Sequence, residues 1–409
     1  MNKYDVAVVG DGAIGYATAY HLLYKNPDLK IAIIGPEYNF GAASWAAGGM
    51  LNLYAELEFD TLDHPLLVER FKFAKRAKDL WPAFAKALGI RLFDTGTVIL
   101  NSNYSTELDD QNFDAIIDQL AEDNVPHALT NHVGGVDPAR LYRSKQYLHI
   151  EDEHSIDPLE LLDTYTRYFE GKSDFIEGNV SKVVKEGTTF NVFIKNKVEF
   201  QADKVVIAAG AASGKILAKS GVKTQKVSSA LGFGWTVYCP DVKLETVVRS
   251  TNRFDACGVA VVPRAEKGVY YIGASSEKTD KLDINAPKLG QMYMIFDQVL
   301  KEINPKFAHA RVQTEHYGNR PVTEDELPLL GKTSVEGLFV ATGTKRDGLF
   351  MSPLIGLHMA ETVLDGWDSF PEIFKPEREP HATRSKEDER LRNEIFKDAY
   401  DYTHPTEKE

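Results

Sequence analysis

Three glycines near the N-terminus, Gly10, Gly12 and Gly15, have the spacing G-x-G-x-x-G, which can hold a phosphate group. They follow a short apolar run over residues 6–9 and precede a helical pattern over residues 16–24. In such a unit the first glycine permits the tight turn, the second lets the backbone approach a pyrophosphate, and the third lets the helix pack on the strand. The helix N-terminus then faces the phosphates. The motif predicts a dinucleotide site that includes Gly10, Gly12, Ala13, Ile14 and Gly15.

The end of the second expected strand, residues 30–34, lacks a feature typical of dinucleotide folds. An acidic residue is expected there to bind the ribose hydroxyls, but the place falls on Gly35. The nearest carboxylate is Glu37. Either Glu37 reaches back to the ribose, or backbone groups and water do that work; the simplest alternative for Glu37 is an exposed loop carboxylate.

A second candidate binding segment runs from Gly41 to Leu51 and consists mainly of small residues. Small side chains build little core, but they let the backbone approach a flat ligand and leave N–H groups free to donate. The segment therefore favours a ligand-binding loop, with a small-residue helix packing face as the alternative.

Together these segments resemble the FAD-dependent D-amino-acid oxidase superfamily, and within it the glycine oxidase branch. The matching residues are Gly10 to Gly15 and Ala43-Ser44-x-Ala46-Ala47-Gly48-x-Met50-Leu51, and the resemblance continues to about residue 370. It implies that FAD is bound, without a covalent link. It also implies cofactor contacts from the small-residue loop and from two later strands: Ser44, Ala46, Ala47, Gly48, Gly49, Met50, Val180, Ala209 and Gly210.

Arg320 lies in Arg320-Pro321-x-Thr323-x-Asp325-x-x-Pro328, which matches the family's motif. A guanidinium binds a carboxylate through two parallel hydrogen bonds, so the resemblance implies that Arg320 anchors the substrate carboxylate. The alternative is a structural ion pair with Glu324 or Asp325.

Arg346 is a second candidate for contact with a carboxylate or carbonyl. By resemblance it belongs to a cofactor-binding turn with Asp347, Gly348 and Leu349, in which Asp347 departs from the asparagine usual in the family. Lys345 is expected to point to solvent, and the alternative is a lysine near the flavin ring that helps oxygen reduction electrostatically. Ser352 and Pro353 form an N-cap and first-turn pair, which predicts the start of the following helix.

The composition excludes several classes of function. A net charge of −13 over 409 residues, without a large basic block, argues against nucleic acid or an anionic membrane as a partner. No apolar run approaches the length of a membrane span. Cys239 and Cys257 suggest neither a disulfide framework nor a zinc site, so we expect a reducing compartment, the cytoplasm.

These residues require an α/β fold: a Rossmann-type FAD-binding domain with a second, α+β antiparallel-sheet substrate domain. We expect the FAD-binding domain over residues 1–53, 150–215 and 316–370, and the substrate domain over 54–149 and 216–315. Residues 371–409 form a charged extension, with a helix around 387–400 that docks on the body or on a second subunit, or that stays mobile.

The resemblance implies an oxidase that converts the C–N bond of a small amino acid or N-substituted glycine to an imine, with oxygen reduced to hydrogen peroxide. Three alternatives stay open. They are a dehydrogenase of an amino or 2-hydroxy acid with another electron acceptor, a tRNA-modifying FAD enzyme, and a flavoprotein without turnover.

Overall fold

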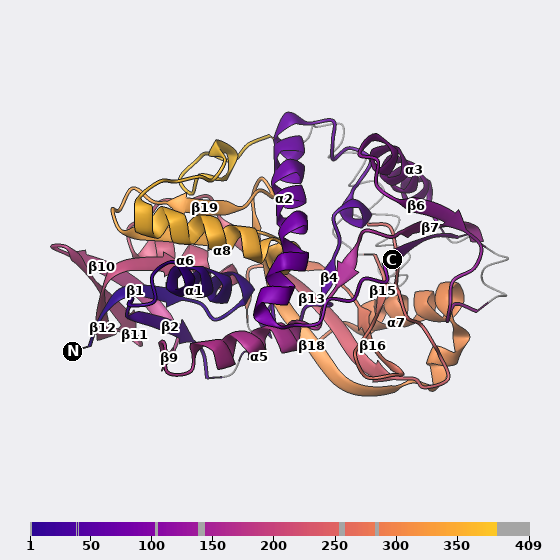
Figure 1. Ribbon diagram of the computed structural model, residues 1–409, viewed down its shortest axis with the longest axis horizontal. Coiled ribbons are helices and arrows are strands. Elements are labelled where there is room, and N and C mark those ends of the chain that lie inside the picture. Colours follow the sequence, from indigo (N-terminus) through magenta and orange to yellow (C-terminus); the bar gives the residue numbers. More distant parts are fainter. Residues whose placement is uncertain are drawn as a thin grey trace, which may run out of the picture.

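The computed structural model describes residues 2–37, 39, 41–102, 105–137, 144–252, 258–282 and 286–382, with residues 144–146 as backbone only. Two large sheets lie side by side along the longest axis, and helix α2 (Pro65–Leu88) stands between them (Figure 1). Cys257 and the helix expected around 387–400 lie outside the described residues.

The first sheet is built around five parallel strands in the order β9, β2, β1, β12, β20. Buried β-branched residues fill β1 and β2, as expected for strands covered on both faces. An antiparallel hairpin and one further strand extend the sheet. The strands are β1 (Lys3–Val9), β2 (Ile31–Gly35), β9 (Asp174–Glu177), β10 (Val180–Glu186), β11 (Thr189–Ile194), β12 (Lys197–Ile207), β19 (Leu329–Lys332) and β20 (Leu338–Thr342).

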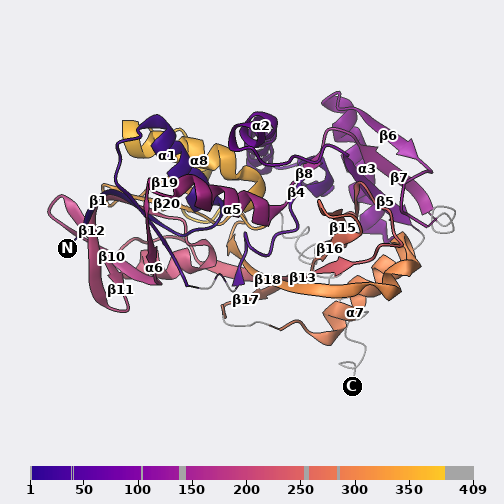
Figure 2. The same cartoon turned by 60° about the horizontal axis from the view of Figure 1, so that its bottom comes forward.

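Helices cover the first sheet on both sides. Figure 2 shows α1 (Ala13–Lys25), α5 (Pro158–Phe169) and α8 (Gly348–Asp365) on one face, and α6 (Ser213–Lys219) with the β10–β11 hairpin on the other. The start of α5 follows the sequence, because the Asp157 carboxylate accepts from Leu159 N at 3.0 Å and Pro158 opens the helix.

The second sheet has ten strands, most of them antiparallel, and α7 (Leu289–Gln298) packs on it. Its long central strands, β13 and β18, reach from the right of Figure 1 to the first sheet. The strands are β3 (Gly41–Ala42), β5 (Thr97–Ser102), β6 (His127–Thr130), β7 (Ser144–Ile150), β13 (Val227–Tyr238), β14 (Val247–Ser250), β15 (Ala260–Pro263), β16 (Val269–Gly273), β17 (Glu277–Thr279) and β18 (Arg311–Thr323).

The remaining elements connect the two sheets. Helix α2 packs against α8, and Trp81 Nε1 donates to the Phe350 carbonyl at 2.7 Å. Strands β4 (Met50–Leu51) and β8 (His154–Ser155) form a small separate pair, while α3 (Glu107–Glu122) lies beside β5. Five short helical turns complete the described chain: η1 (Tyr54–Glu56), η2 (Gly210–Ala212), η3 (Val299–Ile303), η4 (Pro305–His309) and η5 (Glu372–Phe374).

The predicted start of α8 is wrong. The helix begins at Gly348, so Ser352 and Pro353 lie inside it. Pro353 has no N–H to donate to the Leu349 carbonyl four residues before it. The Ser352 hydroxyl donates to that carbonyl instead, at 2.8 Å. Ser352 and Pro353 therefore do not cap the helix; inside it, the Ser352 hydroxyl replaces the hydrogen bond that Pro353 cannot donate.

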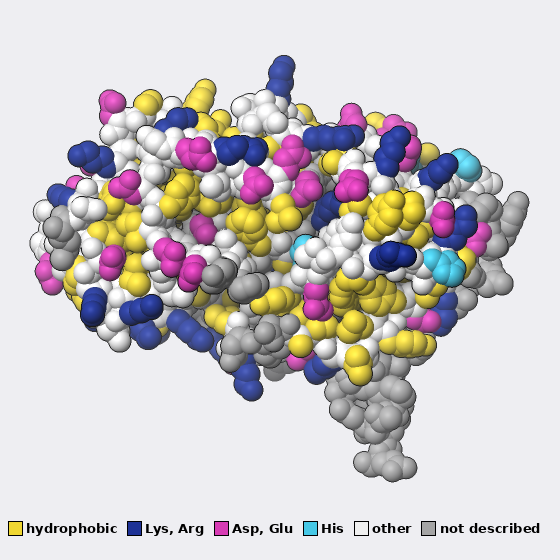
Figure 3. All heavy atoms as spheres, turned by 90° about the horizontal axis from the view of Figure 1, so that it is seen from below, with side chains coloured by type: hydrophobic (Ala, Val, Ile, Leu, Met, Phe, Trp, Pro, Cys, Tyr) yellow, Lys and Arg dark blue, Asp and Glu magenta, His cyan; other side chains and the backbone are white. Residues whose placement is uncertain are grey.

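The charges on the surface are mixed in sign. On the face shown in Figure 3, basic side chains lie among acidic ones. In the described part of the chain, no helix combines the length and the apolar character that crossing a membrane requires.

Candidate active site

A cavity of about 470 Å³ lies where the two sheets meet. The carboxyl ends of β1, β2, β12 and β20 form one wall, and β13, β16 and β18 of the second sheet form the other. The loop over residues 41–50 lies between them. In an open α/β sheet, the crevice at the carboxyl ends of the strands is the usual ligand site.

The glycine turn has the geometry that the sequence predicts. Gly10 has φ +122°, and a Cβ on it would lie 2.2 Å from the Ala208 carbonyl oxygen. A Cβ on Gly15 would lie 1.9 Å from the Gly10 oxygen, so only glycine lets α1 approach the turn this closely. Gly12 faces the cavity, where the nearest atom to an added Cβ is Ser44 Oγ at 3.0 Å.

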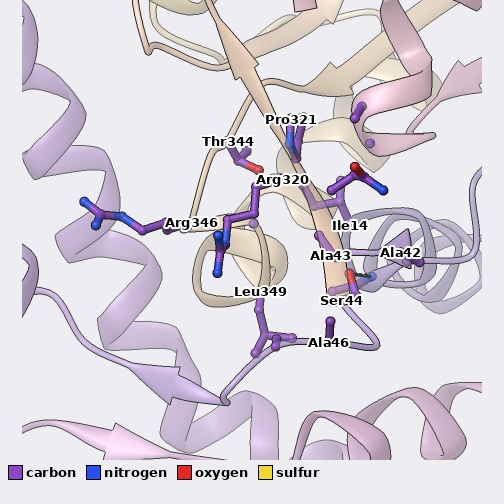
Figure 4. A pocket seen from close by; sticks show the side chains of 18 of the residues that line it. Ile14, Ala42, Ala43, Ser44, Ala46, Arg320, Pro321, Thr344, Arg346 and Leu349 are labelled. Atoms are coloured by element: carbon purple, nitrogen blue, oxygen red, sulfur yellow. Dashed lines mark hydrogen bonds between the residues drawn. The ribbon is translucent and has the colours of Figure 1, made fainter. Parts of the chain in front are cut away.

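The small-residue segment is a loop rather than a helix. Ser44 joins it to the helix N-terminus, because Ala13 N donates to Ser44 Oγ at 3.0 Å (Figure 4). Arg264 holds the loop from the second sheet by donating to the Gly48 carbonyl at 2.9 Å. The Tyr271 ring packs directly on Gly48. Both sheets therefore position this loop.

Nearly all of the predicted cofactor-binding residues line this one cavity. Gly15 does not line the cavity, which agrees with its expected role of letting α1 pack against the turn. Glu37 is exposed and does not line the cavity. The lining includes Gly10, Gly12, Ala13, Ile14, Ser44, Ala46, Ala47, Gly48, Gly49, Met50, Val180, Ala209, Gly210, Arg346, Asp347, Gly348 and Leu349.

Arg320 points from β18 into the cavity, toward Leu349 (Figure 4). Its Nη1 donates to the Ser275 carbonyl at 3.0 Å. The guanidinium lies over Gly232, where a Cβ would come within 2.2 Å of Nη1. Among the described residues no carboxylate forms an ion pair with Arg320. Asp325, one of the partners considered for it, pairs with Arg378 at 2.9 Å. The guanidinium can therefore accept an anionic ligand.

Arg346 points away from Arg320 toward a cluster of charges at the far side of the cavity (Figure 4). It lies 3.7 Å from Glu56 and 3.5 Å from Glu58. Arg249, which is almost fully buried, also pairs with Glu56, and Arg70 of α2 pairs with Asp347. This charge cluster, Arg70, Arg249, Arg346, Glu56, Glu58 and Asp347, contains equal numbers of cations and anions.

The charge cluster sets the protonation of its carboxylates. Burial alone would raise the pKa of Glu56, but Arg249 and Arg346 lower it to about 2. Burial raises the pKa of Asp347, against the opposing effect of Arg70. Glu56 therefore stays ionised and is a poor acceptor of a substrate proton.

A buried carboxylate fixes the segment that carries Glu56. Glu153 Oε1 accepts from the backbone N–H groups of Leu53, Tyr54 and Ala55 at 2.8–3.0 Å. Burial raises the pKa of Glu153 despite these donors. The three hydrogen bonds hold η1 in place, and with it the Glu56 side chain of the charge cluster.

Lys345 does not point to solvent as expected. Its side chain is only 9% exposed, it lines the cavity, and Nζ lies 3.1 Å from Glu326. The backbone explains this, because Lys345 has φ +51° and its N–H donates to the Pro321 carbonyl at 2.8 Å. The turn before α8 is thus folded against the strand that carries Arg320.

The sequence analysis did not single out several cavity residues, among them Asp11, Arg249, Asn252 and Tyr271. Arg249 offered a usable signal, because a charged residue inside an apolar strand run must find a partner. Glu56 also lines the cavity, whereas Tyr54 packs in the core and His64 caps α2.

The structural features of the cavity are those that bind FAD. It has a close-packed glycine turn at a helix N-terminus, a flat loop of small residues and a cationic group at the far end. In fold and site the chain is a dinucleotide-binding α/β protein with a second sheet that closes the site.

Comparison with known proteins gives the family. A family model described as FAD dependent oxidoreductase (DAO) matches residues 5–362. The chain belongs to this family and is an FAD-dependent oxidoreductase, which confirms the predicted fold class, cofactor and class of enzyme.

Similar proteins include glycine oxidases. The glycine oxidase of Geobacillus kaustophilus (strain HTA426) is 28% identical over 372 residues, covering 88% of this chain and 93% of the relative. That of Bacillus subtilis (strain 168) is 24% identical, covering 88% and 93%. The crystal structure of glycine oxidase from Geobacillus kaustophilus has a TM-score of 0.79 at 25% identity, covering 93% of this chain and all of that one.

Proposed function

We propose that this chain is an oxidase of a small amino acid or an N-substituted glycine. It converts the C–N bond to an imine and passes the electrons to oxygen, forming hydrogen peroxide. One observation carries the proposal: Arg320 lies in the cavity without a carboxylate partner among the described residues. The glycine oxidases among the relatives act on a substrate of this class by name.

The electrons and protons of the proposed reaction balance, and the protein has to supply little acid or base chemistry. The substrate loses two electrons and two protons from its H–C–N–H unit, and water hydrolyses the imine to a carbonyl compound and an amine or ammonia. Oxygen takes up two electrons and two protons. FAD, when bound, supplies the two-electron acceptor that links these halves.

The protein's part is to bind and orient. Arg320 holds the substrate carboxylate through two hydrogen bonds and so fixes the C–H bond that must break. Glu56 is ionised and fully engaged by Arg249, so it takes no proton from the amine. We infer that the amine enters in its neutral form. Arg346 supports the site through the charge cluster rather than by reaching the carboxylate.

The proposed domains follow the two sheets only in part. The FAD-binding domain, residues 1–53, 150–215 and 316–370, supplies the glycine turn, and it also includes Arg320, which lies on β18 of the second sheet. The substrate domain, residues 54–149 and 216–315, covers the site. Because the chain has just two cysteines, and Cys239 is a buried free thiol, we propose a reducing compartment such as the cytoplasm.

The test is the flavin spectrum of the purified protein under anaerobic conditions. Glycine, sarcosine and a panel of D- and L-amino acids are added in turn, followed by 2-hydroxy acids. We expect one amine to bleach the flavin band, and air to restore it with one peroxide formed per substrate.

Two other results have distinct meanings. Bleaching by an amine that oxygen reverses only slowly would favour a dehydrogenase with another electron acceptor. A flavin that only 2-hydroxy acids reduce, or that none of these compounds reduces, contradicts the proposed substrate class.

A further inference from the structure

The end of β2 has no acidic side chain of its own, yet a carboxylate lies there. It belongs to Asp11, in the glycine turn after β1. A Cβ built on Gly35 would lie 2.2 Å from Asp11 Oδ2 and 2.3 Å from its Cγ. The carboxylate of Asp11 therefore fills the space that a side chain at position 35 would need.

The surroundings of Asp11 are part of the cavity. Gly35, Pro36, Asn179 and Val180 line the same end of it. With its amide oriented to satisfy both neighbours, Asn39 donates to Asp11 Oδ2 at 3.1 Å and accepts from Trp45 Nε1 at 3.2 Å.

Asp11 has an unused capacity to accept hydrogen bonds. In the described part of the chain no lysine, arginine or histidine forms an ion pair with it. An ionised carboxylate has about four acceptor sites and no donor, so Asp11, which faces the cavity, has acceptor sites available for donors on a ligand. Vicinal hydroxyls of a ribose are two such donors, held side by side.

Glu37 is a poor candidate for the same role. It is exposed and does not line the cavity. Asp11, in contrast, lies between the turn that faces a pyrophosphate and the strand end where dinucleotide folds place their ribose-binding acid.

We propose that Asp11 binds the ribose hydroxyls of the adenosine half of FAD. In this chain the carboxylate comes from the glycine turn rather than from the end of the second strand. Gly35 is glycine because a side chain there would collide with the Asp11 carboxylate. This inference rests on FAD as the cofactor and is independent of the proposed substrate.

The first experiment measures the dissociation constant of FAD from the quenching of flavin fluorescence on binding to apoprotein. A charged acceptor contributes enough that Asp11→Ala should weaken FAD binding by about 10- to 100-fold. Asp11→Asn keeps one acceptor oxygen and should lose less. The matched control, Glu37→Gln, should bind FAD as the unaltered protein does. Unchanged binding by Asp11→Ala, or a loss in Glu37→Gln, overturns the proposal.

A second experiment separates recognition of hydroxyls from a purely structural role of Asp11. ADP and 2′-deoxy-ADP compete with FAD for the apoprotein. The unaltered protein should prefer ADP, and Asp11→Ala should lose that preference. If the variant binds both more weakly but keeps the same ratio between them, Asp11 only supports the turn and the proposal fails.

The third experiment moves the carboxylate back to the strand. Gly35→Glu alone should weaken FAD binding, because the new side chain collides with Asp11. Combining it with Asp11→Ala removes the collision and supplies an acid at the end of β2. The double variant should therefore bind FAD more tightly than either single variant. If it binds more weakly than both, the two positions do not share one role.

Discussion

Arg320 differs from the other arginines of the cavity in its partners. Arg249 and Arg346 are neutralised by Glu56 and Glu58, whereas Arg320 donates only to a backbone carbonyl among the contacts described. A charge that the fold does not neutralise is available to a ligand. At the scale of single residues, this difference supports our proposal that Arg320 binds the substrate, whereas Arg249 and Arg346 stabilise the site.

Arg320→Met tests that separation. Methionine keeps the apolar length of the side chain but removes the hydrogen bonds to the substrate carboxylate, so we expect the KM to rise by about 100-fold. Steady-state kinetics on the substrate found by the flavin assay give the KM, and absorbance gives the flavin content, which should not change. Loss of flavin with an unaltered KM would show that Arg320 supports the fold instead.

Glu56 gives a prediction with a defined dependence on pH. Its pKa falls from 4.5 in the unfolded chain to about 2 in the folded protein, so its ionised form stabilises the fold above pH 4.5. A shift of this size corresponds to about 3 kcal/mol. The contribution is lost as the pH falls through 2.

Glu56→Gln should therefore be less stable than the unaltered protein at pH 7, by about 3 kcal/mol. The difference should shrink as the pH is lowered below 4.5. Thermal unfolding at several pH values measures it, with the exposed Glu37→Gln as control. A difference that does not change with pH would mean that Glu56 contributes through packing rather than through charge.

At the scale of elements, α8 shows how a helix tolerates an internal proline next to the site. Ser352 donates to the Leu349 carbonyl that Pro353 leaves without an amide partner. The repair lets the helix begin at Gly348, so Asp347 and Gly348 lie at the cavity. One side-chain hydroxyl therefore helps set where the turn that lines the cavity ends.

Ser352→Ala removes this repair and leaves a buried carbonyl without a partner. We expect the free energy of unfolding to fall by about 1–2 kcal/mol. Adding Pro353→Ala restores an N–H at the correct position and should recover part of the loss. Chemical denaturation of the single and double variants measures both effects. No loss in Ser352→Ala, or no recovery in the double variant, would contradict this explanation of the helix start.

At the scale of the whole molecule, the cavity belongs to neither sheet alone. The glycine turn comes from the first sheet, while Tyr271 and Arg264 of the second sheet pack on the loop that follows β3. A cofactor bound here touches both parts and should stabilise them together. Helix α2 also contacts both parts, because it packs against α8 and its Arg70 pairs with Asp347 of the charge cluster.

FAD should raise the stability of both parts of the molecule together. At about 100 times its dissociation constant it should add about 2.7 kcal/mol to the free energy of unfolding. Calorimetry on apoprotein and holoprotein should show a shift of the entire unfolding signal to higher temperature. If two transitions appear and only one of them moves, the cofactor contacts a single part.

Much of the first sheet and its glycine turn could be predicted from the sequence. Runs such as residues 6–9 and 31–34 are buried on both faces, so their apolar pattern is local and continuous. The G-x-G-x-x-G spacing predicted the turn because the motif is continuous in the chain, and Gly15 must be glycine because of its close neighbour Gly10. The atoms that crowd Gly10 and Gly12 belong to the distant residues Ala208 and Ser44. The start of α5 is local as well, because the capping contacts of Asp157 and Pro158 lie within two residues.

Only the tertiary structure decided how the charges are paired and which carboxylate lies at the end of β2. Glu56 and Arg249 are 193 residues apart in the chain, and no local pattern indicates that they meet. Asp11 and Gly35 are brought together by the pairing of β1 with β2, whereas the carboxylate nearest to Gly35 along the chain belongs to Glu37. Periodicity reports which face of an element is buried, but the partner of a buried charge depends on how distant elements pack.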